Sequence, residues 1–415
     1  MCEHFTAQQH TSGLPERSKN PMPAMTSRER VRAAINHQEP DRVPVALGGG
    51  PYGITDELYF RLLDRFGFDR SVPPFRQGHN ITYMDDRLLA ALGIDTRYVW
   101  PTSLPTSPVH PTANPNVLAD SFGQPWIRAF PYYYSDTGIL RDRDIDDIDR
   151  IVSWPDTGDP RWTATVRERA RDIHEGTDCF IIGRMVTSHG PFQMACDLRS
   201  TDQFLMDLAL NPDFAHALLA RITDTIDGLL RGYLEAGGPF FDMVELPGDD
   251  YASNDNTLMS LRTFREFFKP HLRRLVETVK SYRADLPVMF HSDGMIASLL
   301  PELIEIGVDV VHPLEPVPRM DLAQIKADYG HQLAFLGAID ISHAMNATVA
   351  DVELEARTRI QQLAPGGGYI LAPSNHLQPD VPPENVIALF DAARRYGRYP
   401  LTSALADQLP PPGPT

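Results

Sequence analysis

Cysteines and long apolar runs are scarce in this chain of 415 residues. The three cysteines, Cys2, Cys179 and Cys196, form neither a pairing pattern nor a CxxC motif, which predicts a reduced, cytoplasmic protein. No apolar stretch approaches the ~20 residues of a membrane helix, and the first residues have no apolar core of a signal peptide. These absences predict a protein without disulfides and without a membrane partner.

Basic residues are also few relative to acidic ones. Lys and Arg total 38 against 55 Asp and Glu, a formal net charge of −17, and no basic cluster stands out. A phosphate backbone would be repelled, so nucleic acid is excluded as a partner. The glycine triplets at 48–50 and 366–368 lack the spacing of a phosphate-binding loop and are interpreted as turns.

The composition that remains is that of a globular protein, with 42% hydrophobic and 22% charged residues. Residues 1–24 are polar and without periodicity and are predicted to be a disordered extension, and residues 401–415 a flexible tail. Between them, residues 25–400 are predicted to form one domain. Its prolines cluster in 101–115, where irregular connections are expected.

Short apolar runs alternate with helical patterns along most of the domain. One helix is predicted from Asn211 and Pro212 to Gly237, and another from Pro383 to Gly397. Seven runs are predicted to be strands: 42–47, 180–185, 241–248, 286–294, 308–316, 333–340 and 368–376. This alternation predicts a parallel sheet covered by helices, and a (β/α)8 barrel is favoured over an open doubly wound sheet because no nucleotide motif is present.

Polar residues stand at the carboxyl ends of the predicted strands, where barrel active sites lie. They are Arg184, Glu245, His291, Asp293, His312, Glu315, Asp340 and His376. A single residue of this kind is often only a helix cap, and Asp340 fits that interpretation too. Asp250 is interpreted as part of a solvated acidic loop, and Glu245, flanked by apolar neighbours, as the better site candidate.

Several stretches resemble the uroporphyrinogen decarboxylase superfamily, and within it the uncharacterised or corrinoid-linked methyltransferase branch. They include TSRERVRAAINHQEPDRVPV (26–45), GPFQMACDLRS (190–200), HSDGMIASLLPELIEIGVDVVHP (291–313) and LAPGGGYILAPSNHLQPDVPPENV (363–386). The resemblance runs in order from residue 26 to about 398. It implies a single (β/α)8 barrel with its cleft at the carboxyl ends of the strands.

The departures from the family pattern bear on the activity. Where heme-pathway decarboxylases carry a substrate-binding arginine loop, this chain reads PVALGGGPYG (44–53), while His376 matches the family's histidine before the last helix. Corrinoid methyltransferases of the family hold zinc with a histidine and two cysteines. Here His291 is kept, Asp293 replaces one cysteine, and Ser374 or Asn375 stands near the other, so a nitrogen and oxygen site for zinc or a harder divalent ion is expected.

The resemblance therefore implies a methyltransferase that moves a methyl group from a small O- or N-methylated donor to a corrinoid carried by a partner protein. His291 and Asp293 are the predicted metal ligands, with Glu245 or His376 as a third. The alternative without metal is that His291 and Asp293 hydrogen-bond each other and a substrate. His376, Asp249 and Glu245 are the predicted catalytic residues.

Four further residues are predicted to bind substrate: Arg184, His312, Glu315 and Asp340. Two other functions stay open: decarboxylation of uroporphyrinogen or another tetrapyrrole, using His376 and Asp249, and a non-catalytic corrinoid or tetrapyrrole binder. A homodimer is the oligomer expected.

Overall fold

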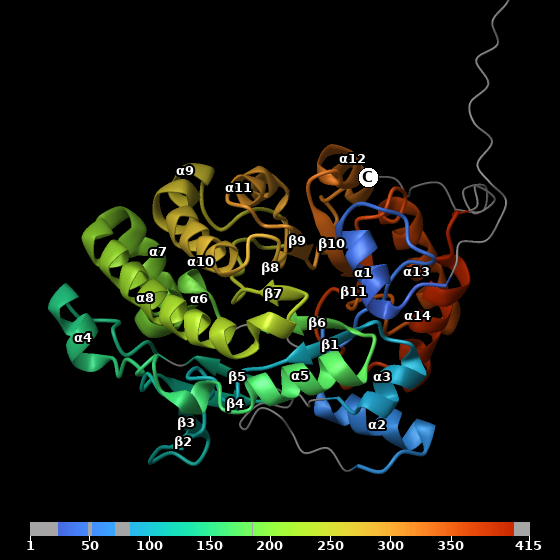
Figure 1. The fold of residues 1–415 in the computed structure, drawn as a ribbon. Helices are drawn as coiled ribbons and strands as arrows, with labels where there is room; N and C mark the ends of the chain where they lie inside the picture. Colours follow the sequence, from blue (N-terminus) through green and yellow to red (C-terminus); the bar gives the residue numbers. More distant parts are fainter. Residues whose placement is uncertain are drawn as a thin grey trace, which may run out of the picture.

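The computed structural model describes residues 24–48, 52–70, 84–130, 132–135, 137–184 and 186–401. The predicted extension and tail lie, apart from residues 24 and 401, outside this part of the chain. Figure 1 shows helices packed around a central set of parallel strands, with α13 and α14 on one side and α7, α8 and α10 on the other.

Seven parallel strands form the central sheet. In sheet order they are β1 (Thr96–Val99), β6 (Phe180–Gly183), β7 (Met243–Glu245), β8 (Val288–His291), β9 (Val310–His312), β10 (Ala334–Ile339) and β11 (Tyr369–Pro373). Six of the seven predicted runs contain these strands. β1 was not among them, because four residues that include an arginine give too short a pattern.

The predicted first strand, 42–47, is not a strand of the structure. It makes a single parallel bridge, Val45 with Leu371, although the amide of Ala46 donates to the Leu371 carbonyl at 2.9 Å and the amide of Asp95 to the Val45 carbonyl at 2.9 Å. The segment thus lies between β11 and the start of β1. The described residues form a seven-stranded parallel α/β fold, and the complete eight-stranded barrel stays a prediction.

Helices surround most of the sheet (Figure 1). Their bounds are α1 (Ser27–Ile35), α2 (Asp56–Phe66), α3 (Asp86–Leu92), α4 (Ile148–Ile151), α5 (Val166–Gly176), α6 (Pro191–Arg199), α7 (Thr201–Leu210), α8 (Pro212–Gly237), α9 (Leu261–Thr263), α10 (Lys269–Tyr282), α11 (Leu300–Glu305), α12 (Leu322–Tyr329), α13 (Val349–Leu363) and α14 (Pro383–Tyr396). Both helices that were predicted from proline and glycine, α8 and α14, are confirmed. Among the described helices, none combines the length and the apolar character of a membrane span.

A second, antiparallel sheet was not predicted. Its strands β2 (His110–Pro111), β3 (Val117–Ala119), β4 (Pro125–Ala129) and β5 (Tyr132–Ser135) pair in sequence order, at the lower left of Figure 1. The prolines of this region argued for irregular connections, and strands of two to five residues leave little periodic signal. The side-chain amide of Gln378 donates to the Tyr132 hydroxyl at 2.6 Å, so β5 lies beside the loop that follows β11.

Alternate residues of the parallel strands face opposite sides. The inner side forms a cluster of its own that contains Tyr98, Phe180, Ile182, Met243, Met289, Val310, Ala334, Leu336, Ile370 and Ala372. Residues between them, such as Ile181, Val244 and Phe290, pack in the larger core against the helices.

Strand β10 departs from the alternation. Gly337 and Ala338 have φ values of 117° and 67°, and Ala338 and Ile339 both belong to the outer core.

Candidate functional site

A layer of buried polar residues caps the apolar inner side of the sheet. Each member stands two positions after the last inner apolar residue of its strand: Arg184, Glu245, His291, His312 and Ser374. All five are buried. Because the strands are parallel, the period of two brings these side chains to one edge, as the sequence predicted for four of them.

Two histidines at the centre of this layer fix each other's protonation. His291 and His312 are register partners on β8 and β9, and their Nδ1 atoms are 2.8 Å apart. His312 Nε2 lies 3.4 Å from the Pro373 carbonyl, which only accepts, so Nε2 carries the proton. The Nδ1 of neutral His312 therefore accepts from the Nδ1–H of His291. This leaves the Nε2 lone pair of His291 free to bind a cation.

That lone pair faces two carboxylates. His291 Nε2 is 3.6 Å from Asp250 Oδ1 and 3.7 Å from Asp293 Oδ1, and one ligand atom from each of the three residues lies within 4.8 Å of the others. Ligand atoms about 2.1 Å from a tetrahedral metal ion are separated by roughly 3.4 Å. The spacing is thus close to that of a three-ligand metal site and too long for hydrogen bonds.

Supporting contacts hold the two carboxylates in place. The Asn375 side-chain amide donates to Asp293 Oδ2 at 2.5 Å, while Asp293 Oδ1 is buried and accepts no hydrogen bond from the described residues. The Gln193 side-chain amide donates to Asp250 Oδ2 at 3.2 Å. The unpaired Asp293 Oδ1 beside the His291 Nε2 lone pair fits a divalent cation as the common partner of both atoms. One nitrogen and two oxygens form a ligand set that suits zinc or a harder ion.

Without a bound cation, the surroundings of the site disfavour the charged forms of Asp293, His291 and His312. Burial, followed by the nearby Asp250 and Glu315 carboxylates, raises the pKa of Asp293 well above its usual value. Burial lowers the pKa of His291 to about 4, against the opposing effect of Asp250. Burial and the neighbouring His291 lower the pKa of His312 well below its usual value. A bound cation would favour ionised Asp293 and neutral His291 together.

Arg184 and Glu245 form a buried ion pair next to the histidines. Arg184 Nη1 pairs with Glu245 Oε2, and the Tyr52 hydroxyl donates to the same oxygen at 3.0 Å. The Arg184 guanidinium carbon lies 4.7 Å from the Trp100 ring centroid and 5.5 Å from that of Tyr52. The Tyr52 ring in turn lies 4.7 Å from that of His312, so the pair is continuous with the histidines.

The structure brings the other predicted strand-end residues to the same edge at different depths. Glu315 accepts from the Gly294 amide at 2.8 Å, next to Asp293. His376 follows Asn375, and its ring centroid is 5.9 Å from that of Tyr132. Asp340 caps the turn after β10, accepting from the amides of Ser342 at 2.8 Å and His343 at 3.1 Å. The roles of these three residues in substrate handling stay predictions.

Asp249 is turned toward a helix. Its carboxylate accepts from the amides of Phe192 at 3.0 Å and Gln193 at 2.8 Å, at the first turn of α6, and from the Tyr251 hydroxyl at 2.9 Å. Burial raises the pKa of Asp249 to about 7, against these hydrogen bonds. The structure therefore gives it a helix-capping position, and its predicted catalytic role stays untested.

Sequence reasoning missed Asp250 and Tyr52 as residues of the site, and it gave Asn375 no contact with Asp293. Asp250 was assigned to a solvated loop, yet it is the third member of the candidate metal group. Tyr52 and Asn375 had no assigned contact, although they hydrogen-bond Glu245 and Asp293. The only signal for Asp250 was its place just after a buried strand, since a loop has no period that reveals side-chain direction.

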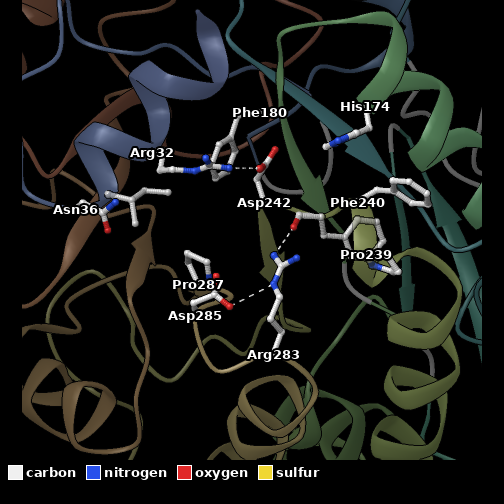
Figure 2. Close-up of a pocket in the computed structure, with 12 residues that line it drawn as sticks. Arg32, Asn36, His174, Phe180, Pro239, Phe240, Asp242, Arg283, Asp285 and Pro287 are labelled. Carbon is white, nitrogen blue, oxygen red and sulfur yellow. Dashed lines mark hydrogen bonds and ion pairs between the residues drawn. The ribbon is translucent and has the colours of Figure 1, made fainter.

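A cavity of about 430 Å³ lies at the opposite ends of the strands. Figure 2 shows Arg32 and Asp242 pointing toward each other across it, and Arg283 directed at Asp285 and the Phe241 carbonyl. Phe180 and Pro287, at the starts of β6 and β8, complete this wall. The amino-terminal face of such sheets serves stability rather than catalysis, and its charged groups here are paired.

Comparison with known families decides the relationship. The family model described as uroporphyrinogen decarboxylase (URO-D) matches residues 142–396. The chain belongs to the URO-D family. The predicted superfamily is thereby confirmed.

The curated relatives of this chain include proteins with two kinds of name. The methylcobamide:CoM methyltransferase MtaA of Methanosarcina barkeri is 25% identical over 388 residues, 90% of this chain and 99% of that one. The uroporphyrinogen decarboxylase of Chlorobium limicola is 26% identical over 183 residues, 43% of this chain and 48% of its own. A likeness over 90% of this chain is thus to a protein named as a methyltransferase.

A solved structure supports the fold of this URO-D family member. A methyltransferase from Methanosarcina mazei superimposes with a TM-score of 0.60 at 20% sequence identity, covering 90% of this chain and 99% of that chain. At this identity the likeness establishes the shared fold alone.

Proposed function

We propose that this URO-D family member is a methyltransferase that takes a methyl group from a small O- or N-methylated donor and passes it to the corrinoid of a separate protein. The observation that carries the proposal is the His291 Nε2 lone pair, held toward Asp250 and Asp293 at the carboxyl edge of the sheet. The likeness over 90% of the chain to a methyltransferase named for a methylcobamide supports it.

Asp250, His291 and Asp293 would hold a divalent ion, which would supply a Lewis acid to the oxygen or nitrogen that departs when the methyl group leaves. The remaining residues prepare this position. His312 holds His291 in the correct tautomer, and Asn375 and Gln193 orient the two carboxylates. His376, which follows Asn375 in the chain, would give a proton to the departing atom.

The eight-stranded barrel belongs to the same proposal. Residues 44–46 hydrogen-bond to Leu371 of β11 on one side and to Asp95, just before β1, on the other. This supports a closed wall around the mouth, with the cleft open at the end where a partner protein would present its corrinoid.

Metal content and methyl transfer test the proposal together. We expect purified protein to carry about one divalent ion per chain. We also expect it to methylate free reduced cobalamin from a panel of O- and N-methylated compounds, and the loss of the cob(I)alamin absorbance measures this reaction. His291→Ala should lose both the ion and the activity. His331→Ala, at an exposed histidine between α12 and β10, is the matched control and should keep both. Full activity in metal-free protein, or unchanged metal content in His291→Ala, would contradict the metal site.

A second candidate is uroporphyrinogen decarboxylation, because several curated relatives carry that name, although their matches span about half of their length. Conversion of uroporphyrinogen to a less carboxylated porphyrinogen at ~1 per second or faster would identify this activity. The absence of arginine from 44–53 leads us to expect little conversion. Loss of all turnover with retained tetrapyrrole binding would instead indicate a non-catalytic binder.

A further inference from the structure

We infer that the Arg184–Glu245 pair binds the carboxylate of the substrate, so that the methyl donor is a small carboxylic acid with a hydrogen-bond donor next to its carboxyl group. The inference rests on the proposed function only in naming this ligand as the methyl donor. The binding site itself is argued from the unused atoms of the pair.

Arg184 keeps one complete edge of its guanidinium unused. The residue has no exposed surface, and its Nη1 pairs with Glu245. Nε and Nη2 are buried and have no hydrogen-bond partner among the described residues. These two nitrogens point their N–H bonds in parallel from the same side of the planar group, which is the fork that a carboxylate bridges with two hydrogen bonds.

Leaving such donors empty is costly. A buried polar group without a partner loses roughly 1–3 kcal/mol, and more when it is charged. The ion pair with Glu245 compensates the charge of Arg184 but leaves the fork unfilled. Unpaired groups of this kind in native proteins call for a missing partner, a water or a ligand, and the fork stands in the polar layer at the edge where ligands of α/β sheets bind.

Glu245 adds a second element of recognition. Its Oε2 accepts from Tyr52 and pairs with Arg184, whereas Oε1 is buried and has no hydrogen-bond partner in the described part of the chain. A carboxylate oxygen only accepts. The ligand must therefore offer an N–H or O–H close to its own carboxylate, as an amino acid or hydroxy acid does.

The charge of the site favours a carboxylate over a phosphate. Arg184 and Glu245 together carry no net charge, and the neighbouring His291 faces the acidic side chains of Asp250 and Asp293. A planar monoanion fits the fork with less repulsion than a tetrahedral group that carries up to two charges. Inorganic phosphate is thus the natural competitor in a test.

Binding must also disturb the neighbours of the pair. The guanidinium is enclosed by the rings of Trp100 and Tyr52, and its nitrogens have no exposed surface for a ligand to reach. An entering carboxylate therefore shifts these rings, and Trp100 is an intrinsic fluorophore. Tryptophan fluorescence, with Trp100→Phe to assign the change, reports on the site without any turnover.

The test compares N,N-dimethylglycine with glycine betaine, N,N-dimethylglycinamide and inorganic phosphate, using the full chain without added metal or corrinoid. N,N-dimethylglycine carries a carboxylate and an N–H, the betaine lacks the N–H, and the amide lacks the carboxylate. We expect saturable fluorescence quenching or enhancement and a rise in Tm with N,N-dimethylglycine, at least tenfold weaker binding of the betaine, and no response to the amide or to phosphate.

Variants separate recognition from folding. Arg184→Lys keeps the charge but loses the fork, and should bind at least tenfold more weakly. The double variant Arg184→Gln, Glu245→Gln removes the charges as a pair, which buried sites tolerate, and should fold but give no response. Arg274→Lys, in an exposed ion pair with Asp224, is the control and should bind as the wild type does.

Equal binding of the acid and its amide, no binding of either carboxylate, stronger binding of phosphate, or unchanged binding in Arg184→Lys would each overturn the inference. These results are independent of methyl transfer. Carboxylate binding by a protein that transfers methyl from no compound of the panel would overturn the proposed function and leave the site standing. Methyl transfer from donors without a carboxylate would do the reverse.

Discussion

At the scale of single residues, the site is defined by the atoms that remain after neighbouring contacts are satisfied. His291 keeps its Nε2 lone pair because its Nδ1–H is donated to His312, and Asp293 keeps Oδ1 because Asn375 takes the other oxygen. Arg184 keeps the side-on fork. Residue identity alone did not predict these leftover atoms, since they depend on the tautomer and rotamer of a neighbour.

The sequence did predict which strand ends carry polar groups. A period of two from Met289 to His291, or from Val310 to His312, gives the side of the sheet directly. Asp250 follows its strand by five residues, after Pro247 and Gly248, and no periodicity survives such a turn. Asp250 comes close to His291 only through the tertiary fold.

Replacing Asp293 with cysteine tests the ligand set at this scale. A thiolate is a softer donor than a carboxylate, so Asp293→Cys should raise the affinity for zinc relative to manganese or magnesium by at least tenfold. Competition titrations with a chromophoric chelator measure the ratio, and Asp293→Asn, which lacks both charge and thiolate, should weaken all of these ions. An unchanged preference in Asp293→Cys would mean that residue 293 does not contact the ion.

At the scale of elements, proline and glycine at the helix ends predicted the two long helices. The short strands were missed because of their length. α8 and α14 have proline in the first turn, and glycine lies at or just beyond their ends. β1 and the strands β2–β5 have two to five residues each, too few for a pattern to be distinguished from a loop. Their positions are set by pairing with distant segments, such as β1 with β6.

The start of α6 depends on Asp249, a residue 57 positions away from Phe192. Asp249→Ala would leave two backbone N–H groups and the Tyr251 hydroxyl without their acceptor, and should lower the free energy of unfolding by about 2–3 kcal/mol. Urea denaturation followed by circular dichroism measures this. Thr348→Ala, which removes an exposed cap of α13, should cost about 1 kcal/mol. A stable Asp249→Ala protein with lost turnover would instead favour the catalytic role predicted from the sequence.

At the scale of the whole molecule, one carboxylate joins the two ends of the sheet. Asp95 is completely buried and accepts from Arg30 at 2.7 Å, from Arg42 at 2.8 and 2.9 Å, and from the Val45 amide at 2.9 Å. It thereby connects α1, the segment after it and the start of β1. The sequence offered no hint of this network, because its members are far apart along the chain.

Removing Asp95 should affect the molecule as a unit. Asp95→Ala removes the carboxylate that pairs with Arg42 and that shares Arg30 with Asp41. It also leaves the Val45 amide without its acceptor, and it should lower the free energy of unfolding by about 3–5 kcal/mol. Thermal and urea unfolding, each followed by two probes, would also show whether the amino-terminal segment separates first. Asp224→Asn, in an exposed pair with Arg274, should change stability by less than about 1 kcal/mol. Similar effects of the two substitutions would show that Asp95 does not join the sheet.

The irregular end of β10 changes which side of the sheet the following side chains face. Gly337 and Ala338 take up left-handed conformations, and the count of inward and outward positions that holds up to Leu336 no longer applies beyond them. Undisturbed alternation would send Ala338 and Asp340 inward beside the histidines. In the structure Ala338 packs outside and the Asp340 carboxylate caps a turn. A single irregularity of the main chain thus removes one carboxylate from the buried layer, with no change in the identity of any side chain.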